Sequence, residues 1–104
     1  MTKKTLFFFL ILSMTGLSGF AQDSATQFKR MCSLCHGPDG KSNTSIGKTL
    51  KSADLTSQAV QSLSDAELYN VIANGKGKMA AYEGILGKQG VEAMVKYVRT
   101  LKQK

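Results

Sequence analysis

The feature that most constrains this sequence is the stretch Cys32-Ser33-Leu34-Cys35-His36, which holds both cysteines of the chain and its single histidine. If the stretch is helical, the two thiols and the imidazole project from one face, because they are three and four residues apart. This is the attachment pattern of a c-type haem, in which the thiols form thioethers with the haem and the imidazole binds the iron. The stretch therefore predicts one covalently bound haem c, held by Cys32 and Cys35, with His36 as proximal ligand.

Three other kinds of site use two cysteines at this spacing. A structural zinc site needs four ligands, and this chain would have to complete one with a carboxylate. A thioredoxin-like pair begins a helix after a strand, whereas no β-rich run precedes Cys32. A disulfide between Cys32 and Cys35 would close a very small loop and stabilise the fold little. Haem attachment is favoured over all three.

The N-terminus has the three regions of a secretory signal peptide. Two lysines precede an apolar run at 6–12, and Gly19 and Ala21 supply the small residues of a cleavage site. We therefore expect residues 1–21 to be removed and 22–104 to form the mature domain. The alternative is a retained membrane anchor, although the apolar run is shorter than the roughly 20 residues of a spanning helix.

The mature chain is small and basic. It keeps 83 of the 104 residues, enough for one domain, and contains no Trp. A bound haem would supply apolar surface that so thin a core lacks. The formal net charge falls from +7 to +5, because Lys3 and Lys4 leave with the leader. A charge this modest on an exported chain gives little support to nucleic-acid binding, and no nucleic-acid partner is expected.

Three segments have helical patterns, and no run shows the period of a strand. The first spans about 24–35. The second is marked by a capping box of Ser64 and Glu67 and by Gly75 where it stops. The third spans about 88–102, with apolar residues every three or four positions. The pattern predicts an all-α fold with three main helices and long loops wrapped around the cofactor.

Between the first two helices, no strong period appears from Gly37 to Leu63. A loop of this length is unusual in a compact domain. A cofactor would explain it, because apolar loop residues can pack against a porphyrin instead of another helix. The candidates are Ile46, Leu50, Leu55 and Val60.

The second axial ligand is left open by the residues alone. Since His36 is the single histidine, the iron would take a methionine sulfur, a lysine amine, water or nothing. Met31 adjoins the attachment cysteine, and Met94 belongs to the apolar side of the last helix. Met79 lies in a glycine-rich loop, where the backbone can turn a side chain inward. A lone methionine is also common core filler, so ligation and packing are equally open for Met79.

Taken together, these motifs make the sequence similar to a small bacterial class I cytochrome c, the monohaem kind that includes cytochrome c6 and the c5- and c551/c552-like carriers. The similarity rests on an aromatic residue four positions before the first cysteine, the haem motif, two loop leucines, two segments around the second helix and a tyrosine in the last helix. These are Phe28, residues 32–37, Leu50, Leu55, residues 63–68, residues 74–79 and Tyr97. The resemblance implies the cytochrome c fold and Met79 as the second axial ligand.

The sequence departs from that family at two places. Ala80 follows Met79 where the family usually has proline, which makes the loop less stiff. Lys48 follows Gly47 where the family often has a proline whose carbonyl holds the other ring nitrogen of the proximal histidine. The carbonyl of Lys48 can still accept that hydrogen bond.

The resemblance implies single-electron transfer and not catalysis. With His36 and Met79 on the iron, no position is left for a substrate, and the soft thioether favours a relatively high potential. If Met79 does not bind, the alternatives are a haem-based gas-binding sensor or a small haem enzyme subunit with an open sixth position. Catalysis is the weaker of these, because the chain offers no distal histidine or other base.

The implied partners are redox proteins, membrane-bound oxidase or reductase complexes among them. Such partners form small, weak interfaces that electrostatic attraction helps to assemble. Lysines flank the haem-binding segments and can form a docking ring for an acidic surface, or they are scattered solubilising charges. They are Lys29, Lys41, Lys48, Lys76 and Lys78. We expect a monomer in the periplasm, since the family's haem is attached outside the cytoplasm.

Overall fold

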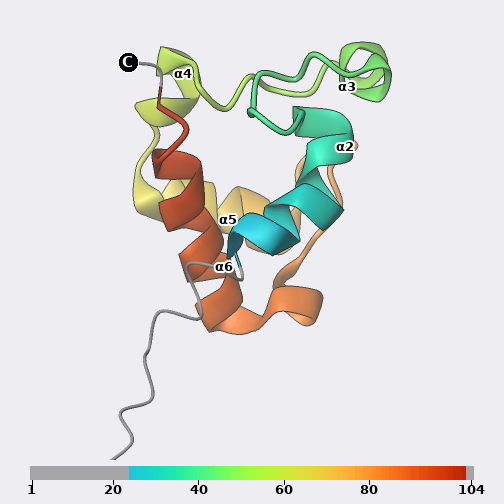
Figure 1. Ribbon diagram of the computed structural model, residues 1–104. Coiled ribbons are helices and arrows are strands. Elements are labelled where there is room, and N and C mark those ends of the chain that lie inside the picture. Colours follow the sequence, from blue (N-terminus) through green and yellow to red (C-terminus); the bar gives the residue numbers. More distant parts are fainter. Residues whose placement is uncertain (1–23, 103–104) are drawn as a thin grey trace, which may run out of the picture.

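The computed structural model describes residues 24–102 of this chain (Figure 1). These residues form helices joined by loops, and the one β-type pairing among them is an isolated bridge between Lys76 and Met79. The predicted all-α fold is confirmed. None of the helices in this part of the chain is both long and apolar enough to cross a membrane. The predicted signal peptide, residues 1–21, lies outside the described residues.

The first helix covers residues 24–36 and has a wide turn in its middle. Residues 24–27 are α-helical, followed by the π-helical turn η1 (Phe28–Cys32) and by α2 (Ser33–His36). The amide of Ser33 donates to the carbonyl of Phe28, five residues earlier, which is the hydrogen bond of a π-helix. The helix was predicted to within one residue at its end, but nothing in the sequence indicated the wide turn.

Helix α5 (Asp65–Asn74) begins and ends where the sequence predicted. The Ser64 hydroxyl accepts a hydrogen bond from the Glu67 amide at 3.0 Å, and the Glu67 carboxylate accepts one from the Ser64 amide at 2.9 Å. This reciprocal pair is the predicted capping box. At the other end the chain leaves the helix at Gly75, whose φ of 81° suits glycine.

Helix α6 (Glu83–Arg99) contains a kink at Gly87, where φ is 73°. The part after the kink begins at Lys88, as predicted, but the helix ends at Arg99 and not at Lys102. The helical turn at 83–86, before the kink, was not predicted.

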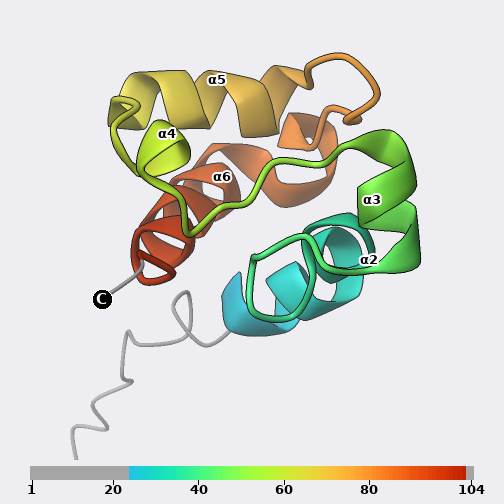
Figure 2. The same ribbon diagram turned by 90° about the horizontal axis from the view of Figure 1, so that it is seen from above.

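The core lies where α6 packs between α5 and the first helix (Figures 1 and 2). The Phe28 ring is 1% exposed and its centroid lies 5.0 Å from that of Tyr97 in α6. The other core residues come from the apolar faces of α5 and α6. They are Leu68, Ile72, Ala73, Val91, Met94, Val95 and Val98. Apolar spacing in the sequence thus predicted most of this core.

Two short helices occupy the segment in which no helix was predicted. They are α3 (Ser45–Leu50), which packs on α2, and α4 (Gln58–Gln61). Each starts at a capping side chain: the Thr44 hydroxyl accepts from the Gly47 amide, and the Ser57 hydroxyl accepts from the Val60 amide. Helices of one turn or little more are too short to show a 3.6-residue period, so their caps are their main sequence signal.

Candidate haem-binding site

The two cysteines and the histidine follow one another along the end of the first helix. Because the π-helical turn finishes at Cys32, the chain from there to His36 has α-helical spacing, and the three side chains share one side of the helix. Both thiols are free and half-buried. Burial, with a smaller contribution from the Cys35 thiol, raises the pKa of Cys32 to about 11. At neutral pH Cys32 is therefore a protonated thiol.

The ring of His36 is oriented by a backbone carbonyl. Its Nδ1 lies 2.9 Å from the carbonyl oxygen of Ala53. A carbonyl oxygen only accepts hydrogen bonds, so Nδ1 carries the proton and donates it. In the neutral ring Nε2 then keeps its lone pair, which is the form in which an imidazole binds a metal.

The sequence allowed the carbonyl of Lys48 to hold His36, but in the structure a different backbone carbonyl does so. Lys48 lies inside α3, where its carbonyl accepts a hydrogen bond from the Lys51 amide at 3.3 Å. The loop supplies Ala53 instead, five residues further on. The short helix α3, which the sequence did not reveal, explains the difference.

These donors suit a haem of the c type. The two thiols stand at the spacing of the vinyl-attachment motif, and the neighbouring imidazole has its metal-binding nitrogen free. A thiol pair used for redox chemistry would instead carry a lowered thiol pKa. The pKa of Cys32 is raised.

Helix α3 lies directly against the haem motif. The Thr44 hydroxyl donates to the carbonyl of Leu34 at 2.7 Å. Beside it, a Cβ added to Gly47 would collide with the carbonyl oxygen of Cys35. Glycine at position 47 therefore permits the close approach of α3 to α2.

Met79 lies in the loop between α5 and α6, half-buried against the core. Its amide donates to the carbonyl of Lys76 at 2.9 Å, and its carbonyl accepts from the Lys76 amide at 3.1 Å. A Cβ on Gly75 would lie 2.6 Å from the Met79 carbonyl oxygen, so the loop folds tightly here. The loop and α2 lie at the same end of the molecule in both views (Figures 1 and 2). Met94 is 1% exposed in the core, as expected of a packing residue.

Tyr82, which no motif in the sequence singles out, connects the Met79 loop with the first helix. Its hydroxyl donates to the carbonyl of Met31 over a long 3.5 Å. Burial, and then the nearby thiols of Cys32 and Cys35, raise its pKa. The only sequence signal was an aromatic residue in a loop that otherwise holds glycine, lysine, alanine and Met79.

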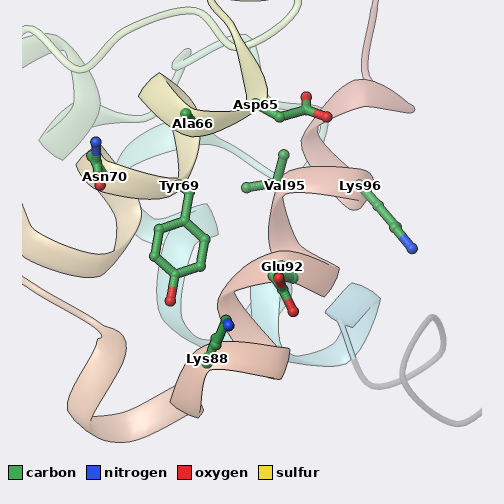
Figure 3. Close-up of a pocket in the computed structure, with 8 residues that line it drawn as sticks. All are labelled: Asp65, Ala66, Tyr69, Asn70, Lys88, Glu92, Val95 and Lys96. Carbon is green, nitrogen blue, oxygen red and sulfur yellow. The ribbon is translucent and has the colours of Figure 1, made fainter.

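A groove of about 540 Å³ lies on another part of the surface, between α5 and α6 (Figure 3). Side chains of both charges line it, among them Asp65, Lys88, Glu92 and Lys96 around the ring of Tyr69. None of the predicted haem-site residues lines this groove.

Comparisons with known proteins agree with this geometry. Residues 20–98 match the family described as cytochrome C oxidase, cbb3-type, subunit III. Cytochrome c6 of Rippkaea orientalis (strain PCC 8801 / RF-1) is 34% identical over 93 residues, which cover 89% of this chain and 81% of that protein. Cytochrome c6 of Microcystis aeruginosa is 33% identical over 76 residues, which cover 73% of this chain and 90% of that protein.

A solved structure is similar as well. The structure of the KustC0563 c-type cytochrome has a TM-score of 0.71 and 27% identity, over 77% of this chain and 98% of that one. The span that matches the family contains all four predicted haem-site residues, Cys32, Cys35, His36 and Met79.

Proposed function

This chain belongs to the class I c-type cytochromes, which bind one haem c covalently, and we propose that it carries single electrons between respiratory redox proteins. In this proposal Cys32 and Cys35 form the thioethers, and His36 and Met79 bind the iron. The observation that carries it is the hydrogen bond from His36 Nδ1 to Ala53, which leaves Nε2 free beside the two thiols. The protein acts as an electron carrier and not as an enzyme.

Each residue has a distinct part in this function. When bound, the haem supplies an iron that gains and loses one electron. Cys32 and Cys35 fix it to the first helix, and the Ala53 carbonyl keeps the His36 ring in the tautomer that can bind. Met79 contributes a soft sulfur from a loop tied by its own backbone to Lys76. With the iron held by both His36 and Met79, neither ligand would need to exchange when an electron passes.

The surface near the haem motif supports docking to a redox partner. Leu34, inside the motif, is 62% exposed. The lysines that flank the haem-binding segments are exposed too, and they would attract an acidic partner. They are Lys29, Lys41, Lys48, Lys76 and Lys78. We propose a weak, small interface of apolar centre and basic rim, suited to an oxidase or reductase complex and to a monomeric carrier.

The place of action follows from the N-terminal sequence. Residues 1–21 have the pattern of a cleaved signal peptide. We propose that they direct the chain to the periplasm and that residues 22–104 are the working protein. Mass spectrometry of the exported, haem-loaded protein tests this, and a mass that includes residues 1–21 would contradict it.

The test of the function is an absorption spectrum of the oxidised, haem-loaded protein. Sulfur ligation gives a weak long-wavelength charge-transfer band, which we expect in the native protein and not in Met79→Ala. Met31→Leu is the matched control, because it removes another methionine near the site and should keep the band. A native protein with bound haem but no band would contradict the closed site and favour the gas-binding sensor or the haem enzyme subunit.

A further inference from the structure

The carbonyl that orients His36 is shared with a second donor. The Ser42 hydroxyl donates to the same Ala53 oxygen at 2.5 Å, beside the 2.9 Å contact of His36 Nδ1. A carbonyl oxygen has two lone pairs, so these two donors occupy both. Ser42 is 9% exposed, and its hydrogen bond to Ala53 is partly buried.

The backbone of Ser42 is held in place as firmly as its hydroxyl. Its amide donates to the carbonyl of His36 at 2.7 Å. Two residues earlier, the carbonyl of Gly40 accepts from the Leu55 amide at 2.7 Å, so the turn at 40–42 is joined to the segment 53–55. Ser42 therefore contacts the histidine directly through its main chain, and it is linked to the His36 ring through the acceptor that they share.

Ser42 also adopts a conformation that serine disfavours. Its φ is 59°, in the left-handed region where glycine is the usual residue. Such conformations persist only where surrounding contacts enforce them, and they concentrate at functional sites. A glycine would fit this turn with less strain but would lack the hydroxyl.

We propose that Ser42 is a positioning residue that raises the reduction potential of the bound haem by sharing the Ala53 carbonyl with His36. A donor on one lone pair draws electron density from the oxygen and weakens the hydrogen bond on the other. The Nδ1–H of His36 is then less polarised, and Nε2 is a weaker electron donor to the iron. A weaker donor stabilises the oxidised iron less, so the potential rises. This inference rests on the proposed ligation by His36.

The experiment compares midpoint potentials of the haem-loaded protein with those of Ser42→Ala and Ser42→Gly. Both variants lose the hydroxyl, but only glycine relieves the left-handed backbone. We expect the two to differ in stability and yet to show the same fall in potential. The expected fall is a three- to tenfold change in the reduction equilibrium against a fixed reference couple, about 28 to 59 mV for one electron.

Ser62→Ala is the matched control. It also removes a serine hydroxyl, but this one donates to the Ala59 carbonyl at 3.2 Å, outside the haem-binding segments. We expect its potential to equal that of the native protein. In the reduced protein, the Nδ1 proton resonance of His36 should move downfield in both Ser42 variants, because the hydrogen bond to Ala53 strengthens. It should stay in place in Ser62→Ala.

Three results would overturn the inference. They are an unchanged potential in both Ser42 variants, shifts that follow stability so that alanine and glycine differ, or an equal shift in Ser62→Ala. Failure of the proposed function would look different, because the sulfur band would then be missing from the native protein before any substitution at Ser42.

Discussion

The two halves of this molecule are held together by different forces. In one, α5, α6 and Phe28 bury apolar side chains, with Val91 and Met94 among the least exposed. In the other, the segment from 37 to 57 is joined by short polar side chains and backbone groups. The Ala53 carbonyl accepts two of these hydrogen bonds, from His36 and Ser42. The first half has a core of its own, while the second keeps the haem ligand in position by hydrogen bonds.

The largest loss of stability should come from removing a buried side chain in the half that holds the apolar core. Phe28→Ala removes a fully buried ring that packs on Tyr97, and we expect the free energy of unfolding to fall by about 3–5 kcal/mol. Denaturant unfolding of the haem-loaded protein measures it. Phe28→Leu keeps most of the apolar volume and should lose clearly less. Equal losses in the two variants would mean that the apolar volume of the side chain at position 28 does not determine the free energy of unfolding.

In the hydrogen-bonded half, a single methyl group should be enough to disturb the structure. Gly47→Ala places a Cβ against the Cys35 carbonyl oxygen, so α3 must move away from the haem motif. We expect a loss of about 1–3 kcal/mol, as for other overpacked sites, with a lower yield of haem-loaded protein. Thermal unfolding and haem absorbance measure the two effects.

Gly84→Ala is the control for that substitution. A Cβ at Gly84 meets nothing within 4 Å, and alanine favours a helix, so this variant should gain up to about 1 kcal/mol. A Gly47→Ala variant as stable as Gly84→Ala would show that the contact between α3 and the haem motif is not tight.

The smallest loss of stability should occur at low pH, when the carboxylate of Asp54 is protonated. The Thr56 hydroxyl donates to its carboxylate at 2.7 Å, and this bond, with the Thr56 amide and nearby Lys41, lowers the pKa of Asp54 from its ordinary 3.8. Because the folded pKa is the lower one, the bond stabilises the fold above pH 3.8, and that contribution is lost as the pH falls through the folded value. Asp54 is exposed, so the loss should be small.

An NMR titration of the Asp54 carboxyl checks this direction. Thr56→Val removes the hydroxyl but keeps the amide, and we expect the pKa of Asp54 to return part of the way toward 3.8. A titration that is the same with and without the hydroxyl would contradict the assignment.

The same contrast explains what the sequence could and could not predict. The capping box of α5 and the apolar spacing of α6 are side-chain patterns, and both were found in the structure. The hydrogen-bonded half depends on main-chain atoms and on the unusual φ of Ser42, neither of which leaves a periodic signal. The wide turn in the first helix has no residue signature either. Ligation by Met79 stays a prediction that the absorption spectrum will test.

The role of Ala53 has a consequence for how this position can vary in evolution. It orients the histidine through its carbonyl oxygen, an atom that every amino acid possesses. The codon for this position can therefore drift, since the exposed methyl group takes no part in the contact. Selection on the histidine's orientation would act instead on residues that shape the path of the loop, such as Gly47 and Ser42. In related sequences we therefore expect Gly47 and Ser42 to be conserved and position 53 to vary, although the carbonyl at position 53 is what orients the histidine.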